Sequence, residues 1–294
     1  MTRVTENMVF ASLTQGIRDA QHKVYKGNRE VSTSLKVERP SAGPVAASRR
    51  RILDAGIAKI SKMGDVAARS EVELAASDTA LAEAANILAR AREIAFSGAS
   101  TGFSAADRRI MATEVAGLRQ LLLGVANTRA GDVYVFGGFQ TTAPPFLPTG
   151  AFAGDANARS AEVAPGEQVA MSGDGAAAFT AAGGIDVFAL LAGLETDLAA
   201  NDTAAVQGRL AGLDAAGLQV RNAQSTVGIA LQIVQTSATT RSHLLQVFAD
   251  SRQQTVGADP AESYVQLTQA QQALQAAVES AARVMSTLAD VLKL

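Results

Sequence analysis

Few residues in this sequence could do acid–base, nucleophilic or metal chemistry. There is no cysteine, which excludes disulfides, thiolate metal ligands and cysteine nucleophiles, and there are only two histidines, His22 and His243. Each histidine lies in a polar stretch with helical periodicity and has no second ligand near it in the sequence. Asp132 and Glu114 could be considered as a catalytic carboxylate pair, but the sequence offers no further ionisable residue that would complete an acid–base site with them. The sequence therefore predicts no metal site and no cofactor.

Sequence motifs for phosphate binding and for hydrolysis are also missing. The chain contains no His-Glu-x-x-His, no Gly-x-x-x-x-Gly-Lys and no Gly-x-Ser-x-Gly. The pair Gly137-Gly138 in "FGGF" is typical of a turn, because no helix with a lysine or hydroxyl group follows it. An enzyme with its site in the β-rich insertion predicted below, at residues 133–185, is kept only as a remote alternative.

The charge and the hydropathy of the chain argue against two further classes of protein, those that bind nucleic acid and those that insert into a membrane. The formal net charge is −2 and the short basic run Arg49-Arg50-Arg51 is typical of a solvated helix face, so we expect no nucleic-acid partner. No window approaches 18 consecutive apolar residues, so we expect no membrane insertion. The opening "MTRVTENMVFASLTQGIRDA" lacks the apolar region of a signal peptide. We therefore expect a cytoplasmic protein, or one exported by a route that reads no cleaved signal.

The composition predicts a mainly α-helical fold. Of the 294 residues 48% are hydrophobic but only 4% are aromatic, and such alanine-rich chains favour long helices packed side by side. We expect helices at about 45–96, 105–125, 186–198, 203–220 and 222–256, with a proline-containing joint at about 39–44. Ser104 is a predicted N-cap with Asp107 as its capping-box acid, and Asp259 is a predicted N-cap before Pro260.

Both ends of the chain show heptad spacing, in which apolar residues alternate three and four apart. The first series is Phe10, Leu13, Ile17, Ala20, Val24, Gly27 and Val31. The second is Tyr264, Leu267, Gln271, Leu274, Val278, Ala281, Met285, Leu288 and Leu292. A helix with one apolar stripe is marginal alone in water, so we expect the two ends to pair with each other or with neighbouring copies.

Between about Val133 and Phe179 the pattern changes to short apolar runs separated by turn residues. "VYVF" and "AEVAPGEQVAMSG" read as strands, with turns at Pro144-Pro145 and Pro165-Gly166. We therefore predict three domains: a terminal coiled-coil assembly domain (1–40 plus 258–294), a helical bundle (41–132 plus 186–257) and a β-rich outer insertion (133–185).

Several segments together resemble the flagellar hook-associated protein 3 family, which is related to flagellin. They are "MTRVTENMVF", "VERPSAGPVAASR", "FSAADRR", "LLGVANTRAGDVYVFGGFQTTAPPF" and "LTQAQQALQAAVESAARVMSTLADVL". The resemblance covers about residues 1–146 and 222–294, and "NTRAGDVYVFGG" is its most specific element. The chain departs from the family at Leu35, where a glycine is expected, and at Ala42-Gly43, where acidic residues are favoured.

The resemblance implies a flagellin-like fold with a structural role and no catalytic residue. The positions it carries over are Asn7, Arg39, Pro40, Pro44, Asn127, Gly131, Phe136, Gly137, Gly138, Gln272 and Leu274. The heptad pattern adds Leu267, Val278, Met285 and Leu288 as assembly positions.

The resemblance also implies partners and a location. The partners are copies of this chain in a ring, hook-associated protein 1 on the hook side, flagellin, an export chaperone and the flagellar type III export apparatus. The location is the extracellular flagellum, at the junction of hook and filament, where the protein would support filament assembly and motility. Flagellin itself is the main alternative.

Overall fold

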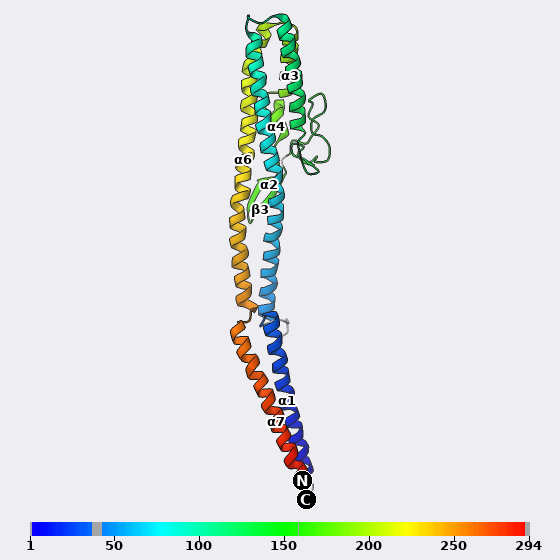
Figure 1. Cartoon of the computed structure of the whole chain (residues 1–294), viewed down its shortest axis with the longest axis vertical. Coiled ribbons are helices and arrows are strands. Elements are labelled where there is room, and N and C mark those ends of the chain that lie inside the picture. Colours follow the sequence, from blue (N-terminus) through cyan, green and yellow to red (C-terminus); the bar gives the residue numbers. More distant parts are fainter. Residues whose placement is uncertain (1, 37–42, 158, 292–294) are drawn as a thin grey trace. The chain divides into compact units, whose positions relative to one another are not determined.

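The computed structural model describes residues 2–36, 43–157 and 159–291, with side chains placed from residue 8 to residue 287. Its long helices are α1 (Thr2–Thr33), α2 (Pro44–Ala99), α3 (Ala105–Ala126), α5 (Val187–Ala199), α6 (Thr203–Val256) and α7 (Pro260–Val291). Between α3 and α5 lie strands β1 (Arg129–Ala130), β2 (Val133–Tyr134), β3 (Ser160–Ala164) and β4 (Glu167–Ala170), then helix α4 (Gly175–Phe179) and the short 3-10 helix η2 (Ala181–Gly183) (Figure 1). The prediction of a mainly α-helical fold with small β elements is confirmed.

The chain forms two compact units. The first unit comprises Met1–Ala58 and Leu245–Leu294, and the second comprises Lys59–Leu244. In the first unit α1 and α7 lie side by side and antiparallel (Figure 1). The beginning of α2 packs there on the end of α6, where a Cβ added to Gly56 would lie 2.7 Å from the ring of Phe248.

In the second unit α2, α3, α5 and α6 form a bundle whose neighbours are joined by ion pairs. Arg90 of α2 bonds Glu114 of α3 at 2.7 Å, and Arg119 of α3 meets Glu195 of α5 at 3.3 Å. The other two links are Arg209–Asp197 (α6–α5, 2.7 Å) and Arg92–Asp214 (α2–α6, 2.5 Å). The Arg90–Glu114 and Arg92–Asp214 side chains are about half exposed, so each of these two pairs contributes at most about 1 kcal/mol. The four ion pairs instead help to specify which helices are neighbours in the bundle.

Helix α2 presents a regular buried stripe to the bundle of the second unit. Buried residues recur three and four apart at Ile60, Met63, Ala67, Ser70, Leu74, Ser77, Leu81, Ala84, Leu88, Ala91 and Ala95. Small residues alternate with large ones, which lets facing helices interdigitate. The helix predicted at about 45–96 is thus confirmed, and its apolar residues Ile60, Leu74, Leu81 and Leu88 lie on this buried face.

Helix α6 corrects one sequence expectation. We predicted a break near residue 221, but α6 runs unbroken from Thr203 to Val256. Its buried series Leu213, Ala216, Val220, Val227, Ala230 and Val234 passes through that point without a change of period. Burial on this stripe therefore outweighs the poor local helix propensity of Gly217 and Asn222.

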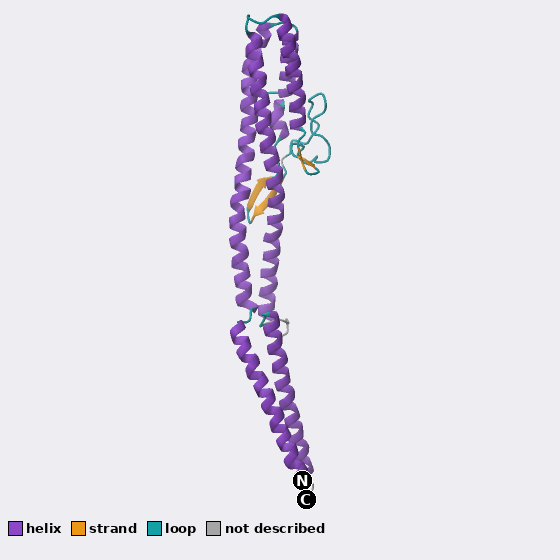
Figure 2. Ribbon diagram, in the orientation of Figure 1, coloured by secondary structure: helices purple, strands orange, loops and turns teal. Residues whose placement is uncertain are grey.

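The segment between α3 and α5 contains two antiparallel two-stranded sheets, β1 with β2 and β3 with β4 (Figure 2). In the second, Ser160 pairs with Ala170 and Ala161 with Val169. The predicted turn at Pro165-Gly166 joins β3 to β4, and the predicted strand at Val133 is confirmed only for Val133–Tyr134.

The aromatic residues of this segment belong to the core of the second unit. Phe136, Phe146 and Phe179 are buried in the same hydrophobic cluster as Leu81, Leu88 and Leu191 of the bundle helices. Phe179 makes edge-to-face contacts with Phe136 (5.4 Å between ring centroids) and Phe146 (5.6 Å). The contacts thus place residues 133–185 within the second unit, and a separate outer domain stays a prediction.

Candidate functional site

The buried residues at the contact between α1 and α7 are mostly small. On α1 the buried residues are Ala20, Gly27 and Glu30, and on α7 they are Ser263, Leu267 and Ala270. A Cβ added to Gly27 would lie 3.3 Å from the Cα of Leu267, so glycine allows the two helices to approach closely. The α1 stripe predicted from the sequence therefore faces α7, except for Phe10, whose side chain is 57% exposed.

The seam on α7 coincides with the predicted series at every second position and lies one residue earlier at the positions between. Its buried and half-buried positions are Ser263, Leu267, Ala270, Leu274, Ala277, Ala281 and Val284. Leu267, Leu274 and Ala281 belong to both the predicted and the observed series. Tyr264, Val278 and Met285 instead stay 61%, 48% and 50% exposed. A helix cannot turn two adjacent stripes fully toward one partner, so these three side chains form a second stripe on α7 that α1 leaves uncovered.

The joint next to this helix pair is held by backbone pairing. The amide of Lys36 donates to the carbonyl of Val256 at 2.8 Å, and the amide of Ala258 donates to the carbonyl of Ser34 at 3.0 Å. Leu35 and Gly257 form an antiparallel bridge between these bonds. These backbone hydrogen bonds therefore hold the residues that follow α1 beside the residues that precede α7. Asp259 caps α7 as predicted, accepting from the amide of Ala261 at 2.8 Å.

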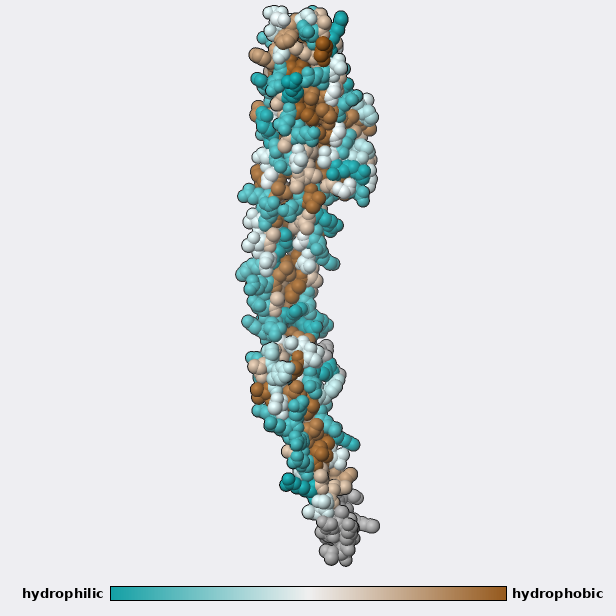
Figure 3. All heavy atoms as spheres, in the orientation of Figure 1, coloured by the Kyte–Doolittle hydropathy of each residue, from teal (hydrophilic) through white to brown (hydrophobic). Residues whose placement is uncertain are grey.

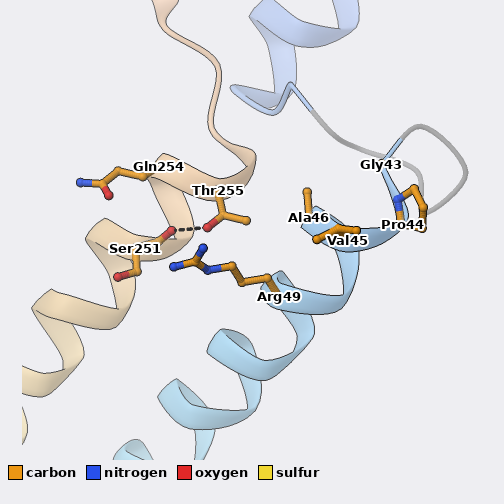
Figure 4. Close-up of a pocket in the computed structure, with 8 residues that line it drawn as sticks. All are labelled: Gly43, Pro44, Val45, Ala46, Arg49, Ser251, Gln254 and Thr255. Atoms are coloured by element: carbon orange, nitrogen blue, oxygen red, sulfur yellow. Dashed lines mark hydrogen bonds between the residues drawn. The ribbon is translucent and has the colours of Figure 1, made fainter.

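A groove of about 650 Å³ lies between the start of α2 and the end of α6 (Figure 4). Its lining includes Pro44, Val45, Arg49, Ser251 and Thr255. The Thr255 hydroxyl donates to the carbonyl of Ser251 at 2.7 Å, so it is engaged within its own helix. Arg49 is the charged side chain of this lining, and one cation beside two hydroxyls supplies neither a general base nor an activated nucleophile.

Asn127 lies directly after α3, at the start of the segment between α3 and α5, which is here called the irregular segment. Its side-chain nitrogen donates to the carbonyl of Phe146 at 2.9 Å, and its side-chain oxygen accepts from the amide of Phe146 at 3.0 Å. These two hydrogen bonds hold Phe146, 19 residues further along the chain, against the end of α3. The structure thus gives Asn127 a positioning role that its sequence neighbours do not reveal.

The glycines that follow are required by backbone geometry. Gly131 and Gly138 have φ of +61° and +62°, in the left-handed region that favours glycine. A Cβ on Gly138 would lie 1.9 Å from the carbonyl oxygen of Asp155, and one on Gly137 would lie 2.2 Å from that of Gln140. These residues, together with the buried Phe136, shape the turn that leads from the bundle into the irregular segment.

The residues weighed for chemistry are not brought together. Glu114 is bonded to Arg90 and Asp132 lies beside Arg129, while His22 and His243 are exposed on α1 and α6. Within the described ranges no cluster of three or more His, Cys, Asp or Glu could hold a metal ion. In the same part of the chain, no helix combines the length and hydropathy that crossing a membrane requires.

Carboxylates in the irregular segment serve its local structure. Asp174 caps α4 by accepting from the amide of Ala177, and Asp155 accepts from the amide of Asn157, both at 2.9 Å. Glu162 accepts from the amide of Gly166 at 2.9 Å across the β3–β4 turn. Each carboxylate is thus satisfied by a backbone donor close to it in sequence.

Sequence reasoning missed the polar residues that seat the β3–β4 hairpin on the bundle. Arg159 pairs with Glu73 of α2, with both side chains largely buried. Arg241 of α6 donates to the carbonyl of Val163 at 2.6 Å. The amide of Gly173 donates to the Ser77 hydroxyl at 3.3 Å. The polar residues Glu73 and Ser77, which lie at or beside the buried stripe of α2, were a sequence signal that this face also binds polar groups.

A second missed residue is Gln219 of α6, which is buried. Its side-chain nitrogen donates to the carbonyls of Ala178, Thr180 and Ile185 at 3.0–3.2 Å, and its oxygen accepts from the amide of Ile185 at 2.8 Å. One amide thus holds α4, η2 and the entry to α5 on α6.

Among the remaining predicted positions, Pro44 is the first residue of α2 and Gln272 is exposed on α7. Arg39 and Pro40 lie outside the described residues. The side chains of Asn7 and Leu288 also lie outside the described part.

Comparison with known proteins connects this architecture to the flagellum. Residues 4–141 match the family described as the bacterial flagellin N-terminal helical region. The chain is similar to the flagellar hook-associated protein 3 of Salmonella typhimurium, with 27% identity over 146 residues that make up 49% of this chain and 46% of that protein. It is equally similar to the protein of the same name from Escherichia coli, with 27% identity over 145 residues. The matched part thus spans about half the length of these relatives.

A solved structure supports the fold. A flagellar hook-associated protein from Vibrio parahaemolyticus superposes with a TM-score of 0.65 at 19% identity, covering 73% of this chain and 99% of that one. At this identity the likeness establishes the architecture of the helices. Together these matches confirm the resemblance read from the sequence.

Proposed function

We propose that this chain is a structural subunit of the bacterial flagellum at the junction of hook and filament. The similarity to two hook-associated proteins 3 supports this role. The structural observation that carries it is the pair α1–α7, which buries few side chains fully and leaves Tyr264, Val278 and Met285 of α7 exposed to solvent. Such a pair is typical of an element that completes its burial against neighbouring subunits.

In this role the protein acts by mechanical matching rather than by catalysis. The terminal helix pair continues the packing of the subunits on either side. The proposed partners are copies of this chain in a ring, hook-associated protein 1, flagellin, an export chaperone and the type III export apparatus. The proposed location is extracellular, after export through that apparatus.

Flagellin is the second candidate, because residues 4–141 match the flagellin N-terminal helical region. The two roles differ in copy number along the filament. A junction subunit forms one short band, whereas a filament subunit is present along the whole length.

The test is to label the protein on purified flagella and to delete its gene. We expect a single labelled band at the hook–filament boundary, and a deletion strain that builds hooks, secretes flagellin into the medium and does not swim. Labelling along the whole filament would support flagellin instead. Normal filaments and normal swimming in the deletion strain would refute both roles.

A further inference from the structure

Helix α6 contains one stretch whose composition is poor for a helix. Of the eight residues from Thr236 to His243, which read "TSATTRSH", five are serine or threonine. Threonine loses side-chain freedom in a helix, and the hydroxyls of both residue types compete for backbone groups, so both are weaker helix formers than alanine or glutamine. All of the eight except Ser237 and Arg241 are exposed, so packing does not explain why weak helix formers stand here.

The inward side of this stretch lacks the apolar burial that holds the preceding part of α6. Val234 is the last buried apolar residue before it, and the inward positions that follow are Ser237 and Arg241. On α2 a Cβ added to Gly64 would meet only the Arg241 side chain, at 3.8 Å. Along the outer edge of α6 in Figure 3, at the level where the helix is orange in Figure 1, hydrophilic residues predominate (Figure 3). Local opening of a helix costs least where few apolar contacts are buried and the backbone is exposed.

The polar side chains of the stretch bond backbone carbonyls instead. The Thr236 hydroxyl donates to the carbonyl four residues earlier at 2.9 Å, and the Ser237 hydroxyl donates to the carbonyl three residues earlier at 2.8 Å. Such bonds slightly destabilise a helix and often bend it, because they draw on acceptors that the helix amides also use. Arg241 donates to the carbonyl of Val163 in β3 at 2.6 Å and to the Ser237 hydroxyl at 2.8 Å. The stretch is therefore held by polar contacts rather than by an apolar core.

We infer that residues 236–243 are a soft segment, at which α6 bends and opens locally while the helix on both sides of it stays formed. The soft segment lies within the second unit. A helix that opens at one place can change its course there without unpacking the buried series from Leu213 to Val234. This property belongs to the chain itself, so it goes beyond the proposed flagellar role and does not depend on it.

Hydrogen exchange followed by mass spectrometry on the purified full-length chain tests the soft segment. After correction for intrinsic rates, we expect the amides of residues 236–243 to exchange about tenfold or more faster than those of residues 213–230 in the same helix. Exchange should slow again at residues 245–250, where Phe248 packs against Gly56. Fraying would instead raise the exchange rate steadily toward the end of α6 at Val256. Such a steady rise, or exchange at 236–243 as slow as at 213–230, would overturn the inference.

A pair of surface substitutions tests the physical cause. Thr239→Ala with Thr240→Ala removes no buried contact, because both side chains are exposed. Alanine is the better helix former, so exchange at 236–243 should slow by about five- to tenfold.

The matched control is Ser225→Ala with Thr226→Ala, which replaces two exposed hydroxyl residues of the same helix beside the buried Val227. This control should leave exchange at 236–243 unchanged. If both double variants slow that exchange equally, or if neither does, while their circular dichroism spectra match the unsubstituted chain, helix propensity does not govern the opening and the soft segment is refuted.

Discussion

The Glu73–Arg159 pair should be the most costly single polar contact to break in the second unit. The two side chains are 11% and 16% exposed, and the pair ties the start of the β3–β4 hairpin to α2. Removing one partner from a buried pair leaves the other charge without compensation, which costs about 3–5 kcal/mol. Because both side chains retain some exposure, we expect Glu73→Ala to cost about 3 kcal/mol, near the lower end of that range.

This free energy corresponds to a large change in melting temperature. For a unit of this size each kcal/mol lowers the melting temperature by about 2–4 °C, so Glu73→Ala should lower it by about 6–12 °C. The double replacement Glu73→Leu with Arg159→Met should recover most of the loss, since two apolar side chains of similar volume leave no unpaired charge. The exposed pair Arg92–Asp214 is the matched control, and Asp214→Ala should cost under about 1 kcal/mol.

Circular dichroism during urea unfolding measures the global effect, since the chain has no tryptophan to follow by fluorescence. A cysteine introduced at Ala178, which is 0% exposed, measures local opening through its rate of thiol labelling. Glu73→Ala should raise that rate in urea-free buffer. If Glu73→Ala and Asp214→Ala have equal small effects on both readouts, the pair is solvated in solution and the reasoning from burial is wrong.

Three further changes test other parts of the structure. Phe179→Ala should destabilise the second unit by about 3–5 kcal/mol in urea unfolding, because the buried ring contacts three other phenylalanines. The Ser104 hydroxyl and backbone amide lower the pKa of Asp107, so its contribution to stability is present above the unfolded value of about 3.9 and is lost as pH falls through the lower folded pKa. Thermal melts of Asp107→Asn should therefore differ from the unsubstituted chain at pH 7 and converge with it in acid. Val278→Asp should leave the melting temperature of the purified chain nearly unchanged, because the side chain is 48% exposed, while it abolishes incorporation into flagella.

Local features of the fold could be predicted from the sequence. The capping box at Ser104 and Asp107 and the cap at Asp259 are confirmed, because a cap depends on residues within one turn. The long helix α2 could be predicted for a similar reason, because apolar residues recur three and four positions apart along its sequence. The break expected near residue 221 was wrong because continuous burial on α6 overrides weak local propensity.

Contacts between distant residues could not be predicted. Glu73 and Arg159 are 86 positions apart, and Gln219 lies 34 positions or more from the groups it binds, so no spacing rule links them. Every second position of the α7 seam was placed one residue away from its observed position. The predicted and observed heptad series share Leu267, Leu274 and Ala281, and only the position of α1 decides which of the two series is buried.

The backbone pairing at the joint limits how the two ends of the chain can change length during evolution. The bridge between Leu35 and Gly257 and the close approach of Gly27 to Leu267 fix α1 against α7 at two points. One residue inserted into α7 between these points would rotate everything beyond it by about 100°, and would turn the seam away from α1. Two full turns, or about seven residues, restore the direction, but only if α1 gains the same length. Insertions between these two points should therefore survive only as matched pairs in both terminal segments, in multiples of seven residues.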